Sequence, residues 1–143
     1  MSKLRLFFLI ILIPVLFFEC EQNNPVPNVP VNIELQLNNP VYNELNVPGN
    51  SIIIPEEGNK GIIVTRIDMN KFSAYDMTCT YDPNDAWGRV VPDETGVFAV
   101  DTVCGSKFHL LFDGMVETGP ASIPLKMYVA DFNSYTNTLR IHN

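Results

Sequence analysis

Residues 61–75 have the sequence GIIVTRIDMNKFSAY, and this stretch decides the fold. Its first half, at 61–67, is rich in β-branched side chains, which favour extended strands. A polar turn follows at 68–70, and residues 71–75 then pair back on the first strand. The stretch therefore predicts an antiparallel hairpin, in a domain whose main element is the strand.

Short strand patterns continue on both sides of this hairpin. Residues 31–38 alternate between apolar and polar side chains, as a strand with one buried face does. Turn sequences at 93–96, 113–114 and 133–137 separate the later runs. No apolar stripe of helical period follows residue 30, so we expect an all-β antiparallel sandwich or small barrel over residues 31–143. The other expected strands are 51–54, 89–91, 97–100, 107–112, 126–132 and 138–142.

The composition fits one folded domain that does not bind nucleic acid. The chain has 143 residues and a net charge of −7. Without residues 1–19 it keeps 7 basic and 15 acidic residues, a net charge near −8. This leaves no basic surface for a phosphate backbone. The sequence contains no phosphate loop, nucleophile elbow, nucleophile–base pair or carboxylate dyad, so we expect no enzymatic activity beyond electron transfer.

The N-terminus has the pattern of an export signal. Lys3 and Arg5 precede an apolar run at 6–18, whose helical length of about 20 Å is short of the ~30 Å hydrocarbon core of a membrane. Cys20 follows, which resembles the cleavage site of a bacterial lipoprotein. Residues 1–19 would then be the signal peptide, and residues 20–30 the lipidated cysteine and a Pro- and Asn-rich tether. The alternative is an uncleaved N-terminal anchor, and both place the domain in the bacterial cell envelope, outside the cytoplasm.

Two stretches in the second half of the chain carry a family resemblance. The first is FSAYDMTCTY at 72–81, and the second is DTVCGSKF at 101–108, followed by DG at 113–114 and GPASIPL at 119–125. Together they resemble a Rieske domain, whose loops carry Cys-x-His, then Cys-x-x-His-Gly-x-x-Phe, then Gly-Pro-Ala-x-x-Pro-Leu. The resemblance covers roughly residues 61–142, and the short lipoprotein form of the chain also resembles Rieske-like lipoproteins of the Bacteroidetes type. This resemblance implies a Rieske-like β-sandwich with a smaller, loop-bearing subdomain of the cluster-binding type.

The resemblance implies four ligand positions, and three of them differ from the family pattern. Cys79 keeps the first cysteine, Tyr81 replaces the first histidine, Asp101 the second cysteine and Cys104 the second histidine. In a Rieske centre the cysteines hold one iron and the histidines the other. Phenolate and carboxylate oxygens are hard donors beside soft sulfides. We therefore expect no cofactor, with Tyr81 filling the vacated space; the alternative is a [2Fe–2S] cluster with abnormal ligands.

The remaining motif residues imply how the loops are held. Gly105 is expected at positive φ at a loop tip, and Phe108 as an anchor in the core. The loop at 119–125 is expected to pack against the other two. The resemblance also puts Cys79 and Cys104 at the same end of the domain, so we expect a disulfide between them in an oxidising compartment.

The sequence thus favours a non-enzymatic envelope lipoprotein, structural or protein-binding, on a Rieske-like scaffold without its cluster. Its partners would be the membrane, through the lipid anchor, and another envelope protein. The alternative is a ferredoxin-like electron carrier of the Rieske type, serving an oxygenase or reductase.

Overall fold

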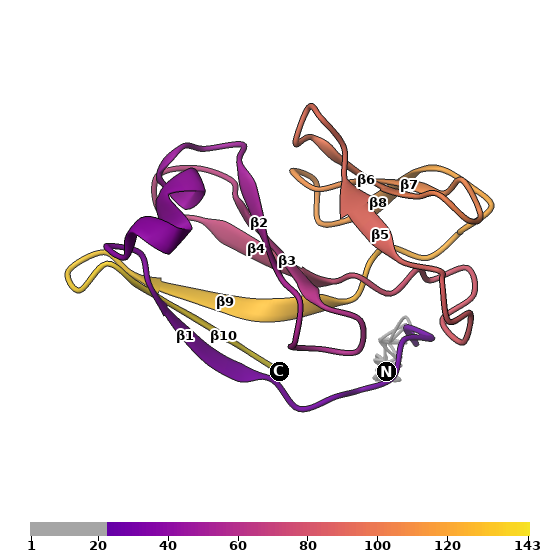
Figure 1. The fold of residues 1–143 in the computed structure, drawn as a ribbon, viewed down its shortest axis with the longest axis horizontal. Helices are drawn as coiled ribbons and strands as arrows, with labels where there is room; N and C mark the ends of the chain where they lie inside the picture. Colours follow the sequence, from indigo (N-terminus) through magenta and orange to yellow (C-terminus); the bar gives the residue numbers. More distant parts are fainter. Residues whose placement is uncertain (1–22) are drawn as a thin grey trace, which may run out of the picture.

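The computed structural model describes residues 23–143, so the predicted signal peptide and Cys20 lie outside the described residues. It confirms the all-β antiparallel fold, with two sheets (Figure 1). A six-stranded sheet has the order β1-β10-β9-β4-β3-β2, and a four-stranded sheet has the order β5-β6-β7-β8. The elements are β1 Asn32–Gln36, η1 Pro40–Asn46, β2 Ser51–Ile54, β3 Ile62–Arg66, β4 Phe72–Asp76, β5 Val90–Pro92, β6 Phe98–Asp101, β7 Lys107–His109, β8 Met115–Thr118, β9 Met127–Asn133 and β10 Thr138–His142.

The predicted hairpin forms strands β3 and β4, and every residue in both strands is buried. Because side chains alternate along a strand, the hairpin has two faces. One face sends Ile62, Val64 and Ala74 into the core of the large sheet. The opposite face sends Ile63 and Tyr75 into a second core, beneath the small sheet. One hairpin therefore serves both cores.

The six-stranded sheet curls into a half-barrel around the first core (Figure 1). Strand β1 pairs with the C-terminal strand β10 along five residues, and β10 pairs with β9 over the same length. The alternation seen in residues 31–38 places Leu35 and Leu37 inside, where both are buried. The buried residues of this core are Val31, Leu35, Leu37, Leu45, Ile62, Val64, Phe72, Ala74, Tyr128, Leu139 and Ile141.

The four-stranded sheet is smaller and covers the second core. Its strands have only three or four residues each. Phe108 is completely buried there, which confirms its expected role as an anchor. The hydroxyl of Tyr75, on β4, donates to the carbonyl of Leu110 at 2.7 Å and so joins the two sheets. This core consists of Ile63, Tyr75, Met77, Cys79, Val90, Ala99, Phe108, Leu110, Ala121 and Leu125.

The sequence patterns did not predict two of the elements, η1 and β8. The 3₁₀ helix η1 begins after Asn39, whose side chain accepts a hydrogen bond from the N–H of Val41, and it buries Leu45. The Asn39-Pro40 pair indicated only the end of a strand. Strand β8 is mostly exposed and lacks an apolar alternation, so no pattern marks it. Within residues 23–143, no helix is long and apolar enough to cross a membrane.

Candidate metal centre

The first loop of the candidate site runs from residue 79 to residue 88. An isolated bridge between Thr78 and Arg89 closes its base. The side chain of Lys60 reaches this loop from outside and donates to the carbonyls of Asp85 at 2.5 Å and Gly88 at 2.8 Å. Cys79 stands at the start of the loop and is 1% exposed. The loop is therefore fixed at both ends, with its thiol directed inward.

The second loop is the tight turn between β6 and β7. Asp101 ends β6, and its carboxylate accepts hydrogen bonds from the N–H groups of Val103 at 2.7 Å and Cys104 at 3.4 Å. Gly105 has a φ of +78°, as expected, and its N–H donates to the carbonyl of Asp101 at 2.8 Å. A side chain with a Cβ adopts this φ only with strain. The turn thereby holds Asp101 and Cys104 on the same side.

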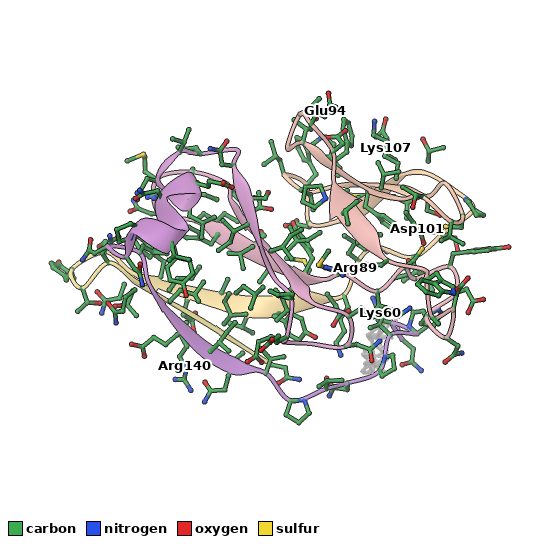
Figure 2. The ribbon with its side chains drawn as sticks, in the orientation of Figure 1. Lys60, Arg89, Glu94, Asp101, Lys107 and Arg140 are labelled. Atoms are coloured by element: carbon green, nitrogen blue, oxygen red, sulfur yellow. The ribbon has the colours of Figure 1, made fainter. Side chains whose placement is uncertain are left out.

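The third loop, at 119–125, packs against the other two as expected. The hydroxyl of Ser106 accepts from the N–H of Ala121 at 2.9 Å and from the thiol of Cys104 at 3.1 Å. The hydroxyl of Thr80 donates to the carbonyl of Ile123 at 2.6 Å. The three loops thus form one hydrogen-bonded unit at the end of the small sheet, where Figure 2 shows Asp101.

Cys79, Asp101 and Cys104 meet between these loops. The two sulfur atoms are 3.5 Å apart. The three potential ligand atoms all lie within 4.8 Å of one another. Two sulfurs and a carboxylate at this spacing form a possible metal site. The expectation of no cofactor is therefore wrong: it judged each changed ligand separately, whereas the fold brings three of the four positions together as one donor set.

The protonation of this group is set by burial and by its mutual hydrogen bonds. Burial, acting with hydrogen bonds to Asp101 and Cys104, raises the pKa of the Cys79 thiol to about 12. Burial also opposes ionisation of Asp101, but hydrogen bonds from Cys79, Val103 and Cys104 outweigh it and hold the pKa of that carboxyl below its ordinary value. Without a cation the charge thus rests on the carboxylate and the proton on Cys79.

A pocket of about 220 Å³ leads from the surface to this group. Asp101 and Cys104 form part of its wall, and Cys79 lies behind them in the core. Tyr81 is 57% exposed, so the expectation that it fills the vacated space is wrong. Its loop turns the phenol toward solvent, and Trp87 on the same loop is 82% exposed. The pocket is lined by Tyr81, Asp82, Asp85, Gly88, Asp101, Val103 and Cys104.

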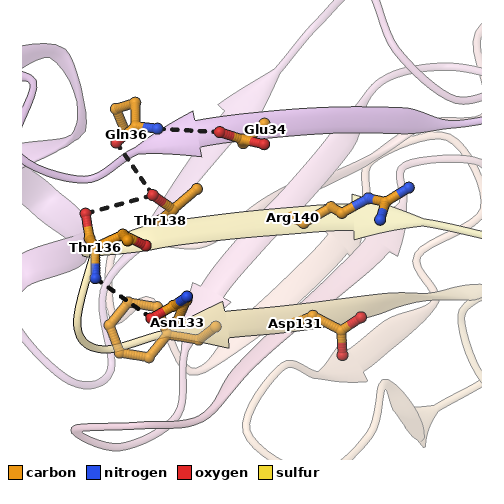
Figure 3. Close-up of a pocket in the computed structure, with 8 residues that line it drawn as sticks. Glu34, Gln36, Asp131, Asn133, Thr136, Thr138 and Arg140 are labelled. Atoms are coloured by element: carbon orange, nitrogen blue, oxygen red, sulfur yellow. Dashed lines mark hydrogen bonds between the residues drawn. The ribbon is translucent and has the colours of Figure 1, made fainter.

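A larger hollow lies on the outer face of the six-stranded sheet. It is an open groove of about 490 Å³ over β1, β10 and β9 (Figure 3). Its polar side chains bond to one another: Gln36 donates to Glu34 at 3.0 Å, and Thr138 donates to Gln36 at 3.1 Å. Its lining contains neither cysteine nor histidine. The centre between the three loops, which brings two cysteines and a buried carboxylate together, is therefore the candidate site.

No known family model matches this chain, and no curated protein matches it. Among solved structures, one similar chain is from the complex of reduced oxygenase and oxidised ferredoxin in carbazole 1,9a-dioxygenase. That chain is 20% identical, with a TM-score of 0.48, and the match covers 66% of this chain and 82% of the other. A second is the putative NADH-dependent nitrite reductase small subunit from Mycobacterium tuberculosis, 15% identical with a TM-score of 0.46, covering 81% and 97%. At these identities and TM-scores the matches say nothing about the activity of this chain.

Proposed function

We propose that this protein is a metal-dependent electron carrier of the cell envelope, tethered to the membrane through a lipidated Cys20. The observation that carries the proposal is the meeting of Cys79, Asp101 and Cys104 behind a surface pocket. Thiolates select iron, copper and zinc over magnesium and calcium. Iron or copper bound there would supply one-electron redox chemistry. This proposal replaces the structural role without a cofactor that the sequence favoured.

The chain itself supplies three things that a carrier needs. The loops fix the ligands before a metal arrives, through Gly105 and the hydrogen bonds of Ser106. The site is shielded from bulk water, since Cys79 and Asp101 are each 1% exposed. It is nevertheless close to the surface through the pocket, so a partner that docks at the pocket rim comes near the ligands.

The test is the metal content and redox behaviour of protein purified anaerobically from membranes. We expect bound iron or copper, and a visible absorption that changes reversibly with one electron per chain. Cys79→Ser combined with Cys104→Ser should abolish both. The matched control is Glu117→Gln, which alters an exposed carboxylate on β8 outside the pocket and should leave both unchanged. Protein that is folded and free of metal, or that holds zinc alone, would rule out electron carriage.

The tether is tested separately by Cys20→Ala. The segment at 21–30 has no apolar face that would insert into a membrane, so anchoring depends on the lipid. We expect the variant to be released from membranes or to remain unprocessed. Unchanged membrane association of a correctly cleaved variant would contradict lipid anchoring.

A protein-binding role is a second candidate, favoured by the exposed residues beside the pocket. Trp87 is 82% exposed, and Tyr81 and Val103 are both more than half exposed. Large aromatic side chains at a surface often anchor a protein partner. If Trp87→Ala prevents co-purification of a partner while metal-free protein still binds it, this second role is the correct one.

A further inference from the structure

The spacing of the three donor atoms matches what one metal ion requires. A tetrahedral ion with metal–sulfur bonds of about 2.3 Å holds two sulfurs about 3.8 Å apart. The sulfurs of Cys79 and Cys104 are 3.5 Å apart, and the Asp101 carboxylate lies within 4.8 Å of both. Small side-chain shifts would therefore bring all three donors onto one centre.

A two-iron cluster does not fit the same atoms. By the resemblance to Rieske domains, Cys79 and Cys104 occupy positions that would serve different irons. Ligands on different irons are separated by both metal atoms and their bridging sulfides, whereas these two sulfurs are in contact. Tyr81, the remaining position, carries a mostly exposed side chain. The residues therefore disagree with a [2Fe–2S] centre.

Groups around the donors support thiolate ligands on a single ion. The backbone N–H of Ser106 points at the sulfur of Cys104 at 3.4 Å. An N–H aimed at a ligand sulfur stabilises its negative charge and fixes its direction. The N–H of Val103 does the same for the carboxylate of Asp101. Asp101 and Cys104 thus each have a backbone donor.

We infer that Cys79, Asp101 and Cys104 bind one divalent ion of borderline softness, such as Fe²⁺, Zn²⁺ or Co²⁺, and leave a fourth position open to the pocket. This inference rests on the proposed metal centre and specifies its nuclearity and ligands. Two thiolates and one carboxylate carry three negative charges, which a divalent ion reduces to one. An open fourth position admits water or a small ligand from the pocket of about 220 Å³.

The test is a titration of the reduced, metal-free full chain with Co²⁺ under anaerobic conditions. We expect one Co²⁺ per chain and an intense sulfur-to-cobalt charge-transfer band. Asp101→Asn keeps an oxygen for the turn but loses the charge, and should weaken Co²⁺ binding at least about 10-fold. Glu117→Gln, at an exposed position on β8 outside the pocket, is the matched control and should change binding by less than about twofold, because an exposed charge is screened. Cys79→Ser and Cys104→Ser should each reduce the charge-transfer band.

The native metal content separates this inference from the function on which it rests. Two irons with two acid-labile sulfides per chain would overturn the single-ion site and leave electron carriage in place. One zinc per chain without sulfide would support the single-ion site and refute electron carriage. Folded wild-type protein that binds no Co²⁺ would overturn the inference, whatever the variants do. Equal weakening by Asp101→Asn and Glu117→Gln would overturn the assignment of Asp101 as a ligand.

Discussion

The two cores of this molecule share one hairpin and differ in almost everything else. The core of the six-stranded sheet contains no sulfur and is closed by ladders of up to five residue pairs. The core of the four-stranded sheet contains Met77 and Cys79, has Cys104 packed against it, and is covered by ladders of three pairs. The large sheet is therefore a scaffold in its own right. The small sheet depends on its buried aromatic residue and on the contacts among its loops, and it carries the chemistry.

The largest expected effect comes from emptying the small core. Phe108→Ala removes a completely buried ring and should lower the free energy of unfolding by about 3–5 kcal/mol. Urea unfolding measures the loss, and hydrogen exchange should place it in β5–β8 before β3 and β4. Phe112→Ala is the control, because that ring is mostly exposed, and it should cost less than about 0.5 kcal/mol. If hydrogen-exchange protection is lost equally in both sheets, the two sheets do not differ in stability as proposed.

A cross-link between the loops should reduce the difference in stability between the four-stranded and the six-stranded sheet. We propose that metal-free protein treated with glutathione disulfide forms a Cys79–Cys104 disulfide, releasing two molecules of glutathione. The bond closes a loop of 26 residues, counted inclusively, and should stabilise the protein by about 3–4 kcal/mol. Mass spectrometry after thiol blocking measures its formation, and Cys104→Ser is the control. Two alkylated cysteines after prolonged oxidation would contradict the prediction.

The buried carboxylate of Asp76, at the end of β4, bonds the hairpin to neighbouring segments. Changing Asp76 therefore tests the stability of the six-stranded sheet. Its oxygens accept from the hydroxyl of Tyr128 at 2.7 Å, the N–H of Asn59 at 2.7 Å, and the N–H and hydroxyl of Thr78 at 2.9 and 2.5 Å. Asp76→Asn turns one acceptor into a donor and should cost about 2–3 kcal/mol. Calorimetry checks this, with Asp131→Asn on the exposed sheet face as the control. A cost below that of the control would show that the network is dispensable.

The smallest expected effect is the response of the β5–β6 turn to acid. Burial opposes ionisation of Asp93, but hydrogen bonds from Thr95 and Phe98 and the charge of Lys107 hold the pKa of its carboxyl below 3.8. A depressed pKa contributes stability above pH 3.8 that is lost as the pH falls through the lower, folded value. Carboxyl-detected NMR should therefore find Asp93 titrating below 3.8, and Thr95→Ala should move its pKa upward. A titration at or above 3.8 in the wild type would refute this account.

The strands were predictable where one face alternates or both faces are apolar, as in β1 and β3. The exposed strand β8 and the 3₁₀ helix η1 were not, because their pairing and packing come from distant segments. The motif located Cys79, Asp101 and Cys104 but suggested that they had lost their role. Their convergence depends on the turn at Gly105 and the clamp through Ser106, which no local pattern encodes. The outward direction of Tyr81 was equally hidden, since it follows from how its loop is closed.

The double burial of the β3–β4 hairpin removes a usual safeguard against mispairing. In a strand with one wet face, a one-residue slip exposes apolar side chains and is rejected. Here such a slip would exchange the apolar side chains at 62–64 and 74–75 between two cores. Alignment must then be enforced by polar bonds, such as the one between Ser51 and Thr65 at 2.8 Å and the one between Tyr128 and Asp76. In this hairpin the burial of apolar side chains supplies the stabilisation, and a few hydrogen bonds between polar side chains fix the register of the strands.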